Sequence, residues 1–129
     1  MAARICLRRE NSLADQAARL AAVKALAKVL PARGDGASLR DVGGTFGALP
    51  PAGRGLATDL AYGVCRHQRL IAHWLDQRLQ KPIKHSAWPV RLALLAGIYE
   101  VWFSERPDHA VLNAWPDVMR DLKAPWASG

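Results

Sequence analysis

The residues in this sequence that could do chemistry are mainly arginines. Thirteen of the eighteen lysines and arginines are arginine, and eleven acidic residues leave a net charge of +7. The arginine side chain offers a planar fork of donors that matches phosphate oxygens, and its flat face stacks on bases. A basic domain of this size therefore indicates a polyanionic partner, of which nucleic acid is one candidate. The alternative is that arginine serves only solubility.

The positive charge is concentrated near the N-terminus. Residues 1–34 contain seven cations and two acids, so this segment carries +5 of the net charge of +7. Neutralising phosphates with such cations releases counterions and gives affinity for RNA of any sequence. The alternative is a solvated helix face without a ligand. The residues of this segment predicted to bind RNA are Arg4, Arg8, Arg9, Arg19, Lys24 and Lys28.

A second set of basic residues lies near the middle of the chain. Arg66, Arg69 and His73 recur at spacings of three and four, which places them on one face of a helix. Arg66 and Arg69 complete the set of predicted RNA-binding residues. For Arg66 the favoured alternative is a structural ion pair with Asp59 or Asp76.

No spacing typical of a catalytic or metal site is found in the sequence. Cys6 and Cys65 are the only cysteines and lie far apart, and the four histidines do not follow a zinc-ligand pattern. His109 has no nucleophile or acid beside it, so we expect it to cap or pack the start of a helix. We predict no catalytic residue, no metal and no cofactor within this chain.

Five tryptophans are many for 129 residues and could stack on unpaired bases. Trp74 and Trp102 lie on apolar helical stripes, so core packing is the favoured interpretation for both. Trp115 and Trp126 lie near the end of the chain and are candidates for packing against a further segment.

These side chains must be positioned by helices, because alanine and leucine dominate and alternating β patterns are absent. The segment 90–103 is apolar nearly all round, which places it at the centre of an all-α bundle. Pro116 is expected to kink or split the last helix. The predicted helices are 13–30, 39–42, 52–79 with a break near 66–68, 90–103 and 109–122, followed by a loop at 123–129.

Single residues refine this prediction. Asn11 or Ser12 is expected to cap the first helix, and Pro89 fits the first turn of the helix at 90–103. Gly63 indicates either a bend or a close approach of two helices.

The length of the chain suits one domain with a real core. No stretch approaches the roughly 20 apolar residues of a membrane span, and no apolar signal-peptide region follows the first arginines. We therefore expect a cytoplasmic protein without a membrane partner.

The segment from Leu49 to Arg66 reads LPPAGRGLATDLAYGVCR and resembles the signature of the NusB-like domain. Its most specific part is the Tyr-Gly-Val-x-Arg block at 62–66. The segments VRLALLAGIYEV at 90–101 and RPDHAVLN at 106–113 resemble later parts of the same pattern, in the right order. The likeness is strongest to the form at the N-terminus of the RsmB (Sun/Fmu) family of ribosomal RNA cytosine-C5 methyltransferases.

This resemblance implies an all-α fold of two small helical subdomains that helps to recognise small-subunit ribosomal RNA. It also implies that residues 1–129 form only the RNA-binding domain and that the last helix of this domain is missing. The methyltransferase domain, with its S-adenosylmethionine, would then follow. The partners implied are ribosomal RNA, that C-terminal domain, and a second copy of the chain in the apolar groove that the missing helix would leave.

Two other interpretations stay open. One is a NusB-type transcription antitermination factor that acts alone and pairs with a ribosomal protein. The other is a helical protein-interaction module whose basic charge is incidental.

Overall fold

The computed structural model describes the chain at residues 2–31, 36–81 and 87–127, and the side chains at 13–31, 36–40, 46–81 and 87–122. No strand occurs in these ranges, which confirms the all-α prediction. The elements are α1 (Ala2–Val29), α2 (Leu39–Val42), the 3₁₀ helix η1 (Gly43–Ala48), α3 (Pro51–Arg78), α4 (Trp88–Phe103) and α5 (Asp108–Ala127).

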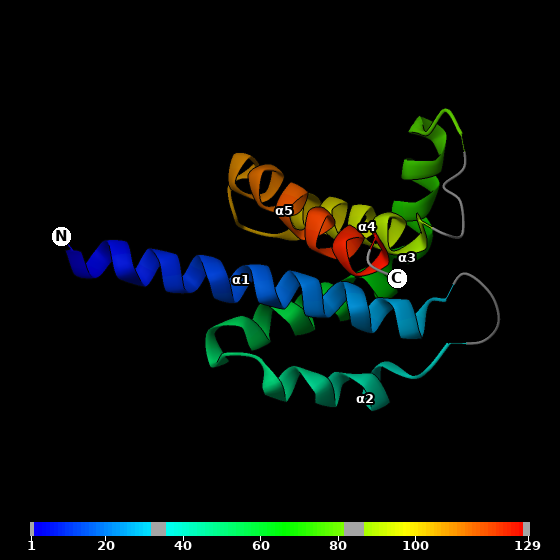
Figure 1. Cartoon of the computed structure of the whole chain (residues 1–129). Helices are drawn as coiled ribbons and strands as arrows, with labels where there is room; N and C mark the ends of the chain where they lie inside the picture. Colours follow the sequence, from blue (N-terminus) through cyan, green and yellow to red (C-terminus); the bar gives the residue numbers. More distant parts are fainter. Residues whose placement is uncertain (1, 32–35, 82–86, 128–129) are drawn as a thin grey trace.

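Helix α1 lies between two groups of helices (Figure 1). On one side are α2, η1 and the first part of α3, and on the other are α4 and α5. Helix α3 connects the groups, because it packs on both α1 and α4. Side chains from α1, η1, α3, α4 and α5 form one hydrophobic core. The N-terminal end of α1 extends beyond the other helices.

Helix α1 begins earlier than the sequence analysis predicts. It runs from Ala2, so the expected start at Leu13 and the expected caps at Asn11 or Ser12 are wrong. The physical reason is that residues 2–12 contain neither glycine nor proline and several good helix formers, so nothing ends the helix there.

Helices α3 and α5 are also more continuous than expected. The break predicted near residues 66–68 does not occur, since α3 is a single helix. Helix α5 passes through Pro116 and continues to Ala127, so the predicted split and the loop at 123–127 are wrong. Tertiary packing outweighs the lost hydrogen bond at Pro116, because one stripe of α5 is buried in the core. That stripe is Val111, Trp115, Val118 and Leu122.

Other predictions are confirmed. The short helix at 39–42 is α2, and α4 starts with a proline in its first turn. Helix α4 occupies the centre of the bundle, with Leu92, Ala93, Leu95 and Ala96 in the core.

Two glycines of α3 allow close helix approach. A Cβ atom on Gly53 would lie 2.7 Å from the carbonyl oxygen of Ala14 and 3.3 Å from the Cβ of Ala18, so α1 and α3 touch there. A Cβ atom on Gly63 would lie 2.0 Å from Cζ of Tyr99. The close-approach interpretation of Gly63 is thereby confirmed.

The substitution Gly53→Ala should destabilise the protein, because the backbone of α1 must move to admit the methyl group. Overpacking of this kind costs about 1–3 kcal/mol, which exceeds the roughly 0.5–1 kcal/mol that alanine gains over glycine within a helix. The matched control is Gly55→Ala on the same helix, where a Cβ atom would meet nothing within 4 Å. The control should be neutral or stabilising. Urea unfolding of both variants is the measurement, and equal stability of the two would contradict the close approach.

Candidate nucleic-acid interface

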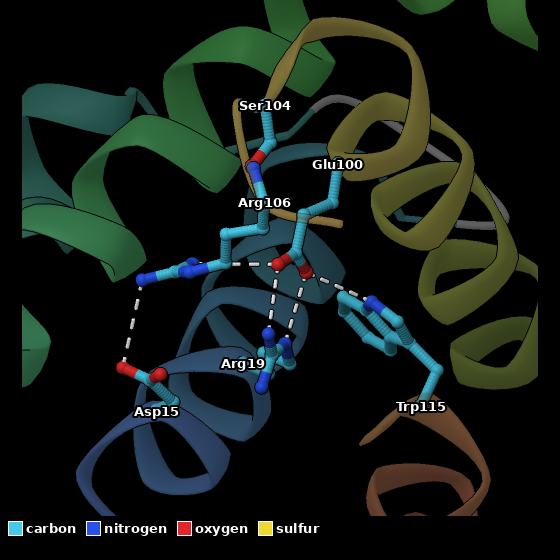
Figure 2. A network of polar contacts seen from close by, with 6 residues as sticks. All are labelled: Asp15, Arg19, Glu100, Ser104, Arg106 and Trp115. Carbon is cyan, nitrogen blue, oxygen red and sulfur yellow. Dashed lines mark hydrogen bonds and ion pairs between the residues drawn. The ribbon is translucent and has the colours of Figure 1, made fainter. Parts of the chain in front are cut away.

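A buried carboxylate lies between α1, which carries Lys24 and Lys28, and helices α4 and α5. Glu100 of α4 is fully buried. Arg19 of α1 donates to both of its oxygens, from Nε to Oε1 at 2.9 Å and from Nη2 to Oε2 at 2.7 Å. Trp115 of α5 donates from Nε1 to Oε1 at 3.0 Å (Figure 2). One carboxylate therefore connects three helices.

Arg106, in the turn between α4 and α5, continues this network toward the surface (Figure 2). Its Nη1 donates to Oε2 of Glu100 at 3.3 Å, and its Nη2 lies 3.7 Å from Oδ1 of Asp15 on α1. The backbone N–H of Arg106 donates to Oγ of Ser104 at 3.0 Å. The turn is thus fixed against both α1 and α4.

The prediction that Arg19 contacts RNA is wrong. Its side chain is 6% exposed, and both of its Glu100 hydrogen bonds are buried. A sequence signal for this role exists, since Arg19 precedes the buried Val23 and Leu26 by four and seven residues. Glu100 is the corresponding signal in α4, because it is the only acid in a segment whose one other charged residue is Arg91.

The pKa of Glu100 reflects this surrounding. Burial by itself raises the pKa of the carboxyl group, but the hydrogen bonds and charge of Arg19, the Trp115 N–H and the charge of Arg106 outweigh it. The pKa is therefore lower than that of an ordinary glutamate. Glu100 is a charged group held by charged and polar partners.

The substitution Glu100→Gln should lower the free energy of unfolding by about 3–5 kcal/mol, because it leaves Arg19 buried without a counter-charge. The control Asp117→Asn breaks a pair with Arg120 in which both side chains are exposed, at 52% and 74%. That exposed pair contributes only about 0–1 kcal/mol. Urea unfolding at neutral pH compares the two variants, and similar losses would contradict the structural role of Glu100.

The variant Glu100→Gln also gives a test by pH. A carboxyl group whose pKa is lower in the folded chain stabilises the fold above the unfolded pKa of about 4.3, and this contribution is lost as the pH falls through the folded pKa. Acid destabilisation below pH about 4.3 should therefore be weaker in Glu100→Gln than in the unsubstituted protein. An unchanged pH profile would contradict the lowered pKa of Glu100.

Lys24 and Lys28 of α1 are placed as predicted, on the surface. Both are exposed and lie one turn apart. They border a depression of about 470 Å³ that Pro89, Asp121 and Leu122 also line. Neither lysine forms an ion pair with another described residue, so both ammonium groups are available to a ligand.

Arg66 and Arg69 of α3 are likewise exposed. The ion pair considered for Arg66 is absent, because its two candidate partners are engaged elsewhere. Asp59 accepts the Tyr99 hydroxyl at 2.8 Å, and Asp76 accepts Nη1 of Arg91 at 2.6 Å. Within the described ranges, Arg66 and Arg69 have no ion pair of their own.

The remaining predicted residues lie on the N-terminal part of α1. Residues 4, 8 and 9 belong to this helix, in the end that extends past the other helices (Figure 1). The side chains of Arg4, Arg8 and Arg9 lie outside the described part, so the roles predicted for them stay predictions.

Several other arginines are engaged within the protein. Arg54 donates to the carbonyl oxygens of Leu49 at 3.1 Å and Gly47 at 3.0 Å, which fixes the entry to α3. Arg78 lies over the ring of Trp74 at 3.9 Å from its centroid. Arg120 pairs with Asp117. Lys24, Lys28, Arg66 and Arg69 are exposed like these three, but they form no ion pair and no side-chain hydrogen bond with another described residue.

Histidine, cysteine and acidic side chains also occur among the described residues. Among them, no group of three or more His, Cys, Asp or Glu side chains could hold a metal ion. Burial raises the pKa of the half-buried Cys65 thiol, and His109 is exposed in the first turn of α5. None of the helices within these ranges combines the length and the apolar character needed to cross a membrane.

The tryptophans divide between core and groove. Trp115 is buried, but Trp102 is 39% exposed, so its predicted place in the core is wrong. Trp102 meets Trp74 edge-to-face at 5.3 Å between ring centroids. Both line an apolar groove of about 330 Å³ along α4 and α5, together with Leu94, Leu112 and Met119. The expectation of an apolar groove on the bundle is confirmed.

This all-α bundle with exposed basic residues belongs to the NusB family, whose sequence pattern matches residues 16–129. The chain is similar to the ribosomal RNA small subunit methyltransferase B of Pseudomonas syringae pv. tomato, with 36% identity over 121 residues, or 86% of this chain and 24% of that protein. The protein of the same name from Pseudomonas putida is 37% identical over 112 residues, or 86% of this chain and 25% of the relative. The chain thus spans about a quarter of the length of these relatives. No solved structure matches it.

Proposed function

We propose that this chain is the RNA-binding N-terminal domain of a ribosomal RNA (cytosine-C5) methyltransferase, where it helps to recognise small-subunit ribosomal RNA. The observation that carries the proposal is that Lys24, Lys28, Arg66 and Arg69 are exposed and unpaired within the described ranges. The similarity to two small-subunit ribosomal RNA methyltransferases supports the choice of RNA as the polyanion.

In this role the NusB-like domain would bind the RNA, and the domain that follows it would carry out the methyl transfer. Exposed lysines and arginines neutralise phosphates, which gives affinity and orientation but little sequence selectivity. A binding domain tethered to a catalytic domain raises the effective concentration of the RNA at the reacting centre. The catalytic residues and S-adenosylmethionine would belong to the methyltransferase domain, and the whole protein would act in the cytoplasm.

The second candidate is a NusB-type antitermination factor that acts alone. Membership of the NusB family favours it equally, since the family match alone does not require a methyltransferase domain. The open reading frame of the gene distinguishes the two candidates. A coding region that continues for several hundred codons with a cofactor-binding loop supports the methyltransferase, and a stop codon shortly after Gly129 supports the lone factor.

The RNA-binding proposal predicts a loss that depends on which cations are removed. The double variant Lys24→Gln/Lys28→Gln should bind RNA more weakly and lower the slope of log affinity against log salt by about 1.5, at roughly 0.7–0.9 per lost phosphate contact. The control Arg91→Gln/Arg120→Gln removes the same charge from arginines that are paired with acids. Fluorescence anisotropy over a salt series measures both slopes. Equal losses, or binding to heparin as tight as to RNA, would contradict the proposal.

The apolar groove along α4 and α5 suits the C-terminal methyltransferase domain, which is the second partner that the family resemblance implies. We propose that the methyltransferase domain packs there, and that two copies of the isolated domain pair through the same groove. Light scattering should show a dimer at high concentration, which Leu112→Lys in the groove abolishes. Leu70→Lys is the control, because Leu70 is equally exposed but does not line the groove. A monomer at every concentration would contradict the pairing.

A further inference from the structure

A stack of aromatic rings reaches the surface where α4 ends. Phe103, the last residue of α4, is 46% exposed. The ring of His67 on α3 stacks on it with 4.3 Å between centroids and 14° between planes. Tyr99 lies 5.2 Å from Phe103 at 27°, and its hydroxyl is held by Asp59 at 2.8 Å. The three rings are therefore nearly parallel, and the hydrogen bond to Asp59 holds the Tyr99 ring in place.

Basic groups border this stack. Tyr62, Arg66 and Arg69 follow each other on α3 at spacings of four and three, which places them on one face of the helix. Tyr62 is 42% exposed, and both arginines are exposed and unpaired among the described residues. The charge of Arg66 acts on the Tyr99 hydroxyl, where it opposes the rise in pKa that burial causes. Arg66 and Arg69 line a surface depression together with His67, the ring that stacks on Phe103, so both arginines lie beside the stack.

The exposed Phe103 lines a surface depression of about 640 Å³. Asp59, Glu105 and Arg106 also line it. The two carboxylates would repel a phosphate placed in the depression itself. A nucleotide bound here would keep its phosphate on the side of Arg66 and Arg69 and its base against the aromatic rings.

We propose that Phe103 forms a stacking platform for unpaired bases, with the flanking phosphates held by Arg66 and Arg69. The inference rests on the proposed RNA-binding function and narrows its ligand to single-stranded RNA. Paired bases in an A-form duplex are stacked on each other and do not offer their faces, whereas splayed bases of a single strand stack readily on aromatic side chains. Electrostatic contacts alone would not distinguish the two forms.

The test compares three RNA ligands by fluorescence anisotropy at fixed salt: a short single strand, the same strand with its central bases removed, and a duplex. The substitution Phe103→Leu should weaken binding of the intact single strand by roughly tenfold, since stacking contributes about 1–3 kcal/mol per base. It should leave the abasic strand and the duplex unchanged, because they present phosphates without free base faces. The salt slope should not change.

Trp102→Leu is the matched control. Trp102 is a similarly exposed aromatic residue one position earlier in α4, but its ring lines the apolar groove and meets Phe103 only edge-on, at 6.4 Å between centroids. This variant should bind the intact single strand as the unsubstituted protein does. Circular dichroism and the melting temperature establish that both variants are folded before affinities are compared.

Two results would overturn the inference. If Phe103→Leu binds the intact strand normally while the unsubstituted protein binds RNA, the stacking platform is wrong and the proposed function stands. An equal loss on the abasic strand would also overturn it, because the ring would then act without a base. If the unsubstituted protein binds none of the three ligands, the proposed function fails together with the platform.

Discussion

One buried ion pair constrains how the helices of the bundle sit against each other. A carboxylate with no exposed surface is costly unless charged donors surround it, and Glu100 receives four hydrogen bonds from Arg19, Trp115 and Arg106. These donors come from α1, α5 and the turn after α4. The requirement to satisfy Glu100 therefore determines how α1 sits against α4 and α5, and the small residues of α1 and α3 then allow close packing.

This pair also removes one cation of α1 from the surface. Arg19 is taken into the core, whereas Lys24 and Lys28 on the same helix stay exposed. The described surface has distinct regions as a result. Exposed cations lie on α1 and α3, an aromatic stack lies at the end of α4, and an apolar groove follows α4 and α5. Each region suits a different class of contact: phosphate, base and protein.

The sequence predicts the fold class, the centre of the bundle and the close approach at Gly63 because these follow from periodicity and residue size. It misses the length of α1, the continuity of α3 and the passage of α5 through Pro116, since tertiary burial decides those. Arg19 is misplaced for the same reason: charge counts do not show which guanidinium meets a buried carboxylate. The stack of His67 on Phe103 joins residues 36 positions apart, and spacing along one helix cannot reveal it.

The most direct test of this division between core and surface replaces the buried pair. The double variant Arg19→Met/Glu100→Leu removes both charges together, so no charge of the pair is left buried without its counter-charge. The Nε1–H of Trp115 loses its acceptor, but the hydrophobic core should keep the bundle folded. Its RNA affinity over a salt series is the measurement. The double variant should bind RNA with the affinity and the salt slope of the unsubstituted protein, because Arg19 lies in the core and not at the RNA interface. In a folded double variant, a salt slope lower by about 0.7–0.9, the value of one lost phosphate contact, would show that Arg19 binds RNA and would contradict the account.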